Sequence, residues 1–345
     1  MADSSDLAGG VTVAIPVRDG GELFVELLDA LARQSVAHEV LVCDSGSRDG
    51  SRERALERGA RVIAIAPEEF GHGRTRNLLL AQARGTHVAL LSQDAIPADE
   101  RWLERMVNSF SLAADVGLVY GPYIPRPGAP APVRIELTSW FSSLAPDGAA
   151  RLDRLSPEEA AAGAAETVLD LIGRRGFFTD ANACIARSAW ERVPFRDVAY
   201  AEDRALALDM LRRGYAKVFV PDAAVVHSHT YRPRQQLRRC FDEWRGLLEV
   251  YGWREPLDLM RAGSQLRGDL GRARRELDAQ AASPRERIQT LAAVGAHRLL
   301  CLTGALLGSR ADRIPPWLAR SLSLESRPGA GTGKGQQLPV DSVAP

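Results

Sequence analysis

Short apolar runs alternate with segments of helical periodicity over the first 120 residues. The apolar runs are rich in β-branched residues and stop at Pro, Gly or Asp, as expected of buried strands. The first segment between them, residues 22–33, carries Leu23, Leu27, Leu28 and Leu31 at the spacing of an amphipathic helix. Strands separated by helices predict an α/β fold with a doubly wound, mostly parallel sheet and helices on both faces. We expect strands over residues 11–15, 39–43, 61–65, 87–91 and 116–120, and helices over 22–33, 51–58, 74–83 and 102–113.

The pattern becomes less regular beyond residue 120. A Pro- and Gly-rich stretch over residues 121–132 predicts a loop, and Ser156-Pro157-Glu158-Glu159 has the composition of a helix start. Farther along we expect a strand over 177–187, a helix over 202–213 and a strand over 216–220. Composition then shifts to a basic, helical pattern and finally to Gly, Ser, Pro and Gln, which is typical of disorder. These changes divide the chain into a flexible start (1–10), an α/β domain (11–233), a helical region (234–325) and a disordered tail (326–345).

The strand expected over residues 87–91 delivers a lone carboxylate, Asp94, to the end of the sheet. In open α/β sheets, ligands bind at the carboxyl ends of the strands. A carboxylate at that edge can hold a divalent cation that also contacts phosphate oxygens. Asp94 therefore marks the expected ligand site.

The composition disfavours several other classes of protein. The 44 basic and 44 acidic residues balance, so no overall field favours nucleic acid. The cysteines Cys43, Cys184, Cys240 and Cys301 are far apart, which disfavours a metal cluster or disulfide framework and fits a reducing cytoplasm. The first residues lack the basic and apolar regions of a signal peptide, and no run of about 18 apolar residues predicts a spanning helix.

Six polar motifs occur in a fixed order along the chain. The motifs are Ile15-Pro16-Val17-Arg18, Asp44-Ser45-Gly46-Ser47-Arg48-Asp49-Gly50-Ser51, Phe70-Gly71-His72-Gly73-Arg74-Thr75-Arg76-Asn77, Ser92-Gln93-Asp94-Ala95, Ala201-Glu202-Asp203 and Val226-His227-Ser228-His229-Thr230-Tyr231. Together they closely resemble family 2 glycosyltransferases of the GT-A fold, and among these the bacterial rhamnosyltransferases. The resemblance covers about residues 11–235, two thirds of the chain.

The resemblance implies an inverting transfer of a sugar, most plausibly rhamnose from dTDP-rhamnose, to a hydroxyl of a cell-surface polysaccharide or lipid-linked glycan. Such a reaction needs a base for the acceptor hydroxyl and positive charge for the departing diphosphate. By resemblance, Asp203 is the base, with Glu202 beside it at the same helix start. Asp94 would hold Mg²⁺ or Mn²⁺, and His227 or His229 would contact the metal or the diphosphate.

The remaining expected site residues surround the two substrates. Asp180 and Asn182, on one face of their strand, are candidates for binding the acceptor. The common D-x-D motif supplies two carboxylates, whereas Ser92-Gln93-Asp94 supplies one, so Arg74 and Arg76 are expected to share the charge stabilisation. The residues expected to bind the nucleotide are Pro16, Arg18, Asp44, Asp49, Arg74, Arg76, Asn77 and Gln93.

Each of these residues also has an ordinary structural explanation. Asp44 and Asp49 can form turns, Asp94 can cap the next element, and Glu202 and Asp203 suit the first turn of a helix. The paired histidines, the arginines and the residues expected at the acceptor are equally weak signals when taken singly. One common site explains the joint pattern better than independent structural roles.

Four rival functions differ in recognisable features. A retaining glycosyltransferase shares the fold and differs in product stereochemistry, and a non-catalytic scaffold would bind glycan or nucleotide without transfer. A nucleotidyltransferase usually has a basic, Gly-rich loop near its start, and Gly20-Gly21 lacks lysines. A Rossmann oxidoreductase is disfavoured because G-x-G-x-x-G does not follow the first strand.

The helical region suggests peripheral contact with the inner face of the plasma membrane. Arginines from Arg232 to Arg245 lie among aromatic residues, a composition suited to an anionic lipid surface. The apolar stretch over residues 291–307 contains His297 and Arg298 and is expected to be too short and too polar to span. The alternative is a helical pair that packs on the α/β domain with its arginines in water.

Overall fold

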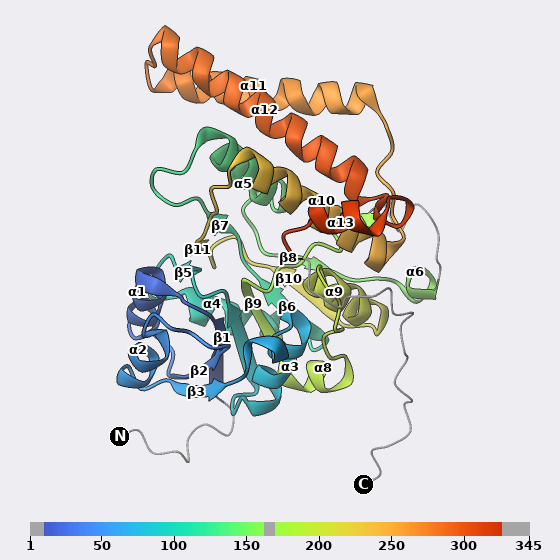
Figure 1. Cartoon of the computed structure of the whole chain (residues 1–345). Coiled ribbons are helices and arrows are strands. Elements are labelled where there is room, and N and C mark those ends of the chain that lie inside the picture. The colour runs from blue at the N-terminus through green and yellow to red at the C-terminus, as the bar shows by residue number, and fades with distance from the viewer. Residues whose placement is uncertain (1–9, 162–169, 326–345) are drawn as a thin grey trace.

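The computed structural model of the chain describes residues 10–161 and 170–325, and the disordered tail expected from the sequence lies outside them, as does the flexible start except for Gly10. An eight-stranded sheet runs through the molecule in the order β3-β2-β1-β4-β9-β6-β10-β8 (Figure 1). Its strands are β1 (Val11–Val17), β2 (His38–Asp44), β3 (Arg61–Ala64), β4 (His87–Leu91), β6 (Val116–Tyr120), β8 (Arg151–Asp153), β9 (Asn182–Ala186) and β10 (Ala216–Phe219).

The sheet is mostly parallel, as predicted, with two reversed strands. β3, β2, β1 and β4 run parallel, while β9 runs antiparallel to both of its neighbours, β4 and β6. The strand expected over 177–187 begins only at Asn182, which pairs with Leu91 at the end of β4. Because β9 runs against β4, the residues just before β9 lie at the same sheet edge as the residues just after β4.

Helices cover both faces of the sheet, which confirms the doubly wound arrangement. Successive residues of β1 point to opposite faces, so that Val13 and Ile15 pack in one apolar cluster and Ala14 packs in the other. On the first face lie α1 (Gly21–Leu31), α2 (Ser51–Glu57) and α4 (Trp102–Asn108). On the second lie α3 (His72–Gln82), α8 (Arg187–Arg192) and α9 (Glu202–Arg212). Shorter helices are η1 (Pro67–Glu69), η2 (Ser109–Leu112) and α6 (Pro157–Ala161).

A second, small sheet forms beside the carboxyl edge, in segments for which no strand is among the predicted elements. It consists of β5 (Ile96–Pro97), β11 (Val225–Val226) and β7 (Tyr123–Ile124), in the order β5-β11-β7. A helix that the pattern does not predict, α5 (Ala131–Leu144), follows β7 and packs through Phe141 and Leu144 on the second apolar cluster. The stretch 121–132 is therefore partly ordered into β7 and the start of α5.

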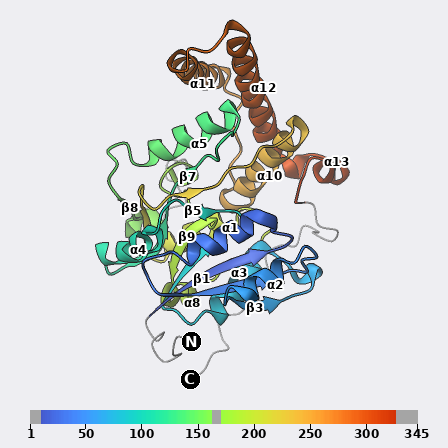
Figure 2. The same cartoon turned by 90° about the vertical axis from the view of Figure 1, so that its left-hand side faces the viewer.

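The C-terminal region is helical, as expected, and consists of α10 (Pro233–Tyr251), α11 (Leu259–Ala279), α12 (Pro284–Gly308), η3 (Ala311–Arg313) and α13 (Pro316–Ser321). α11 and α12 form a hairpin that projects away from the large sheet in both views (Figures 1 and 2). α12 packs closely on α10, because Gly304 and Gly308 bring the two backbones together: a Cβ at Gly308 would lie 2.3 Å from the carbonyl oxygen of Phe241.

Of the helices described, α12 alone is long and apolar enough to cross a membrane, judged by length and composition. Its most apolar 18-residue window has a mean hydropathy of 1.5, and 22% of that window is buried in the protein. The expectation that this region is too short and too polar to span considered residues 291–307 alone, whereas the helix extends over Pro284–Gly308.

Candidate functional site

A pocket of about 440 Å³ opens at the carboxyl edge of the sheet. Side chains from α3, the segment before β9, the start of α9 and the segment after β11 line it, together with residues of α5 and α10. Sequence segments that are far apart therefore converge where the strand order predicts a ligand.

The residues expected to bind metal come together, and two of them, His227 and His229, line this pocket. Pairing of β11 with β5 sets Val226 opposite Ile96, which brings His227 and His229 next to Asp94. Nδ1 of His227 lies 3.4 Å from Oδ1 of Asp94, and Nε2 of His229 lies 3.8 Å from Oδ2 of the same carboxylate. One donor atom from each of the three residues lies within 4.8 Å of the others.

The protonation and surroundings of this group suit a divalent cation. Burial lowers the pKa of His227 to about 4 and also lowers the pKa of His229, so both imidazoles are neutral at pH 7 and can donate a lone pair. Nδ1 of His227 is buried and has no hydrogen-bond partner among the described residues, as expected of an atom whose partner is a ligand. One carboxylate and two imidazoles can hold Mn²⁺, and they fit Mg²⁺ less well because Mg²⁺ prefers oxygen ligands.

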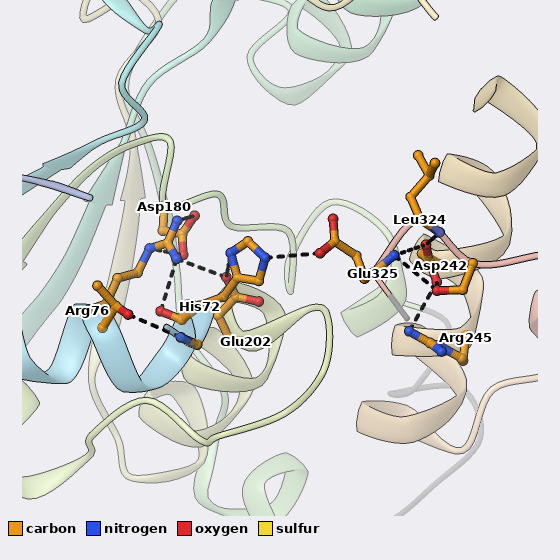
Figure 3. Close-up of polar contacts among 11 residues, drawn as sticks. His72, Arg76, Asp180, Glu202, Asp242, Arg245, Leu324 and Glu325 are labelled. Carbon is orange, nitrogen blue, oxygen red and sulfur yellow. Dashed lines mark hydrogen bonds and ion pairs between the residues drawn. The ribbon is translucent and has the colours of Figure 1, made fainter. Parts of the chain in front are cut away.

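A buried arginine joins two of the carboxylates that line the pocket (Figure 3). Arg76 of α3 places Nε 2.5 Å from Oδ2 of Asp180 and Nη1 3.1 Å from Oε1 of Glu202, and all three residues are buried. Burial raises the pKa of Asp180 to about 7, although the charge of Arg76 opposes the rise. Since two carboxylates already bind the Arg76 guanidinium, its charge is largely balanced within the protein.

Asp203 faces the pocket from the first turn of α9. Burial, reinforced by the charge of Asp180, raises the pKa of Asp203 to about 7. A carboxylate with a pKa near the working pH is suited to accept a proton from a hydroxyl group. Ala201, the N-cap of α9 two residues before Asp203, has the left-handed backbone angles φ 65° and ψ 30° that are uncommon outside glycine.

Two of the residues expected to bind nucleotide form turns at the end of β2. The carboxylate of Asp44 accepts hydrogen bonds from the backbone N–H groups of Gly46 and Ser47, and Asp49 accepts from Ser51 and from the backbone of Gly21. These are the ordinary turn roles of Asp. Asp44 and Asp49 do not line the pocket described above.

Gln93 and Arg18 connect the ends of β4 and β1. The side chain of Gln93 accepts a hydrogen bond from the backbone N–H of Arg18 at 2.8 Å and donates one to its carbonyl oxygen at 3.2 Å. The Arg18 side chain is exposed at this edge, and Pro16 is half-buried within β1. This contact fixes the direction of the loop that carries Asp94.

Asn77 and Asn182 have structural roles in this arrangement. Asn77 accepts from Trp190 Nε1 and from the backbone of Phe195, and it donates to the Phe195 carbonyl oxygen. Asn182 is fully buried: it accepts from Trp102 Nε1 and donates to the carbonyl oxygens of Pro122 and Ala223. With these polar atoms engaged, neither side chain faces the pocket, which speaks against the predicted roles of Asn182 in acceptor binding and Asn77 in nucleotide binding.

Arg126 is the basic residue next to the expected metal-binding group, and it is not among the residues predicted from the sequence. Its guanidinium donates to the carbonyl oxygen of Asp94 and lies 3.8 Å from the Asp94 carboxylate. Arg74, which was expected to help stabilise a diphosphate, is instead exposed and lies 3.6 Å from Asp197. Arg126 belongs to the Pro- and Gly-rich stretch, where no periodic pattern indicates which side chains face the site.

The comparisons with known proteins agree with this architecture. Residues 12–144 match the sequence model of the family described as glycosyl transferase family 2. The O-antigen chain rhamnosyltransferase RfbN of Salmonella typhimurium (strain LT2) is 29% identical over 238 residues, 67% of this chain and 70% of that protein. The O-antigen chain rhamnosyltransferase WbaN of Salmonella anatum is 29% identical over 237 residues, with the same shares of the two chains. A mannosyltransferase of Pyrobaculum calidifontis, solved in complex with GDP-Man and Mn²⁺, shares the fold, with a TM-score of 0.54 at 19% identity over 89% of each chain.

Proposed function

We propose that this chain, a member of glycosyltransferase family 2 with the GT-A fold, transfers a sugar with inversion from a nucleotide sugar to a hydroxyl of a cell-surface glycan or its lipid-linked precursor. The observation that supports the proposal best is that one pocket is lined both by Asp203, a carboxylate whose pKa is near neutrality, and by His227 and His229, two of the three residues of a group able to hold a divalent cation. These are the two chemical functions that glycosyl transfer requires.

In the proposed reaction, Asp203 accepts the proton of the acceptor hydroxyl as its oxygen attacks the anomeric carbon. The acceptor oxygen forms the new glycosidic bond while the bond from the anomeric carbon to the diphosphate breaks. Arg76 and Glu202 hold Asp180 in place beside the base, and the charge of Asp180 keeps the pKa of Asp203 high enough for it to accept a proton near pH 7. A single base on the face opposite the leaving group gives inversion.

Asp94, His227 and His229 would hold the cation, Mn²⁺ or Mg²⁺. When bound, the cation would supply positive charge to the departing diphosphate. Arg126, beside Asp94, adds a fixed positive charge to the same part of the site. Because Arg76 is already paired with two carboxylates, we assign the leaving-group charge to Arg126 rather than to Arg76 or Arg74.

The proposed donor is dTDP-rhamnose. Support comes from the two relatives that are named O-antigen chain rhamnosyltransferases, each 29% identical to this chain over 67% of its length. The proposed nucleotide site is the sheet edge at the ends of β1, β2 and β4, where Pro16, Arg18, Asp44 and Gln93 lie. A retaining mechanism with the same donor would differ in the anomeric configuration of the product.

A thermal-shift panel of nucleotide sugars with and without Mn²⁺ tests the donor site. We expect dTDP-rhamnose to raise the melting temperature only with the metal, and Asp94→Ala to abolish the shift. Stabilisation by a different nucleotide sugar would reject the rhamnose assignment and keep the donor site. No stabilisation by any nucleotide sugar would contradict the proposal.

Substitution of the base tests the mechanism. Asp203→Asn should lower kcat by about 10²- to 10⁴-fold, the usual contribution of a positioned base, and should leave donor binding intact. Asp209→Asn is the matched control, because Asp209 is on the same helix and pairs with Arg196 outside the pocket. Near-normal turnover in Asp203→Asn would exclude Asp203 as the base, and product configuration determined by NMR separates inversion from retention.

A cytoplasmic location with peripheral contact at the inner face of the plasma membrane is the proposed setting. Leu257, just before α11, and Leu259 and Met260, at its start, are exposed to 71%, 77% and 83%, an unusual run of large apolar side chains at a protein surface. Arg261 and Arg267 follow on the same helix. Apolar side chains beside basic ones are the composition expected at an anionic bilayer.

A further inference from the structure

The last described residues of the chain are fixed to α10 by a buried carboxylate (Figure 3). Asp242 is fully buried and accepts hydrogen bonds from Ser323 Oγ at 2.6 Å, from the backbone N–H of Leu324 at 2.6 Å and from that of Glu325 at 3.2 Å. Arg245, one turn along α10, lies 3.0 Å from the same carboxylate and balances its charge. Because a buried carboxylate is stable only with such partners, Asp242 specifies where this segment lies.

Because residues 323–325 are held in this way, Glu325 lines the pocket on the side of α3. Oε2 of Glu325 lies 3.4 Å from Nε2 of His72, and Nδ1 of His72 lies 3.8 Å from Oε1 of Glu202 (Figure 3). Burial opposes protonation of His72, but the hydrogen bond to Glu325 and the charge of Glu202 outweigh it, so that the pKa of His72 lies above its usual value. The imidazole of His72 thus connects a carboxylate from the C-terminal region to the cluster beside the base.

The position of Glu325 favours the acceptor over the donor nucleotide. Of the residues expected to bind the nucleotide, only Arg76 lines this pocket, whereas the base Asp203 and residues of α5 and α10 line it together with Glu325. A carboxylate accepts hydrogen bonds from neighbouring sugar hydroxyls, and charge-assisted hydrogen bonds are strong and directional. The negative charge of the same carboxylate repels a nucleotide diphosphate.

We propose that Glu325 and His72 form a binding subsite for hydroxyl groups of the acceptor sugar, and that Asp242 holds Glu325 at this subsite. The inference rests on the proposed glycosyltransferase function and adds the part of the site that recognises the acceptor. Glu325 binds the acceptor directly, and Asp242 is a positioning residue that acts through the segment 323–325.

Steady-state kinetics with acceptor and donor varied separately test the subsite. Glu325→Ala should raise the KM for the acceptor by about tenfold or more, the effect of losing a hydrogen bond to a charged group, with the donor KM unchanged. Glu325→Gln, which keeps one acceptor oxygen, should recover part of the loss. Glu249→Ala is the matched control, because Glu249 is exposed on α10 and does not line the pocket.

The positioning role of Asp242 is tested separately. Asp242→Asn should raise the acceptor KM as Glu325→Ala does, and the double variant should be no worse than either single variant, because both remove the same contact. Where Asp242→Asn folds poorly, Ser323→Ala removes one hydrogen bond of the same set and should show a smaller effect in the same direction.

The outcomes distinguish this inference from the function on which it rests. If the wild-type protein transfers no sugar from any nucleotide donor, the proposed function fails. If it transfers sugar and Glu325→Ala behaves like Glu249→Ala, the subsite is wrong and the function stands. If Glu325→Ala is faster than wild type at low acceptor concentration, Glu325 obstructs the pocket, which also overturns the inference.

Discussion

Asp203 and Asp180 hold their protons to unusually high pH, chiefly because both are buried. Burial raises the pKa of each to about 7, and the charge of Asp180 adds to the effect on Asp203. Asp180 is held by Arg76, whereas Asp203 bonds only to the neighbouring backbone N–H of Arg204 among the hydrogen bonds described for its side chain. Of the two carboxylates, Asp203 is therefore the one available to a substrate.

The pKa of Asp203 predicts the pH dependence of the reaction. A base acts only when deprotonated, so kcat/KM for the acceptor should rise with pH through about 7 and then level off. Asp180→Asn removes the neighbouring charge and should move the rise to lower pH. Initial rates measured from pH 5 to pH 9 check both statements, and a profile that is flat between pH 6 and pH 8 would contradict them.

The same shift predicts the effect of Asp203 on stability. The pKa is 3.8 for an ordinary Asp and about 7 here, so the folded protein retains a proton that the unfolded chain releases. Stability is therefore lost as pH rises between these two values, and Asn, which does not ionise, escapes the loss. We expect Asp203→Asn to raise the melting temperature more at pH 8 than at pH 5. Asp209→Asn, on the same helix and outside the pocket, is the matched control and is measured at the same two pH values.

At the scale of elements, the hydrophobic periodicity of the sequence predicted those helices and strands that are regular and long enough for their pattern to repeat. The strands expected over 87–91 and 116–120 have the observed bounds, because each is a continuous buried run between turn signals. The two-residue strands β5, β7 and β11 are too short for any alternation to appear, and they exist because they pair with one another. The reversal of β9 is likewise a property of the sheet, set by its neighbours rather than by its own residues.

α12 packs closely on α10 at a glycine, Gly308, while another glycine of α12, Gly295, has open space around it. Replacing glycine by alanine should therefore have opposite effects on stability at these two positions. A Cβ at Gly308 would lie 2.3 Å from the Phe241 carbonyl oxygen, whereas a Cβ at Gly295 meets nothing within 4 Å. Gly308→Ala should destabilise the fold by about 1–3 kcal/mol through overpacking. Gly295→Ala should stabilise it by up to about 1 kcal/mol, the gain in helix propensity. Melting temperatures of both variants check the signs, and equal shifts would exclude close packing at Gly308.

At the scale of the whole molecule, the site unites segments whose proximity no local pattern encodes. Asp94, His227 and His229 were predicted as one group because their motifs resemble a family, and the fold does bring them together. His72 and Glu325 are 253 residues apart in sequence, and their contact depends on a buried Asp242 in a third element. Contacts of this kind follow from tertiary packing alone.

The exposed apolar start of α11 predicts binding to anionic lipid. The double variant Leu259→Glu with Met260→Glu should reduce flotation of the protein with anionic vesicles at low salt, because it replaces apolar contact with repulsion. Leu56→Glu is the control, since Leu56 is also exposed but lies on α2 in the α/β domain. Wild-type protein that remains at the bottom of the gradient would contradict membrane contact.

The group of Asp94, His227 and His229 has a consequence for the order of binding. It contributes one negative charge, since the lowered pKa of each histidine leaves its imidazole neutral, and Arg126 beside Asp94 offsets part of that charge. A divalent cation bound there would keep excess positive charge until a diphosphate supplied the remainder. Metal and donor would then be thermodynamically linked, each raising the affinity for the other by the same factor. A protein built in this way would retain the ion tightly only while the nucleotide is present.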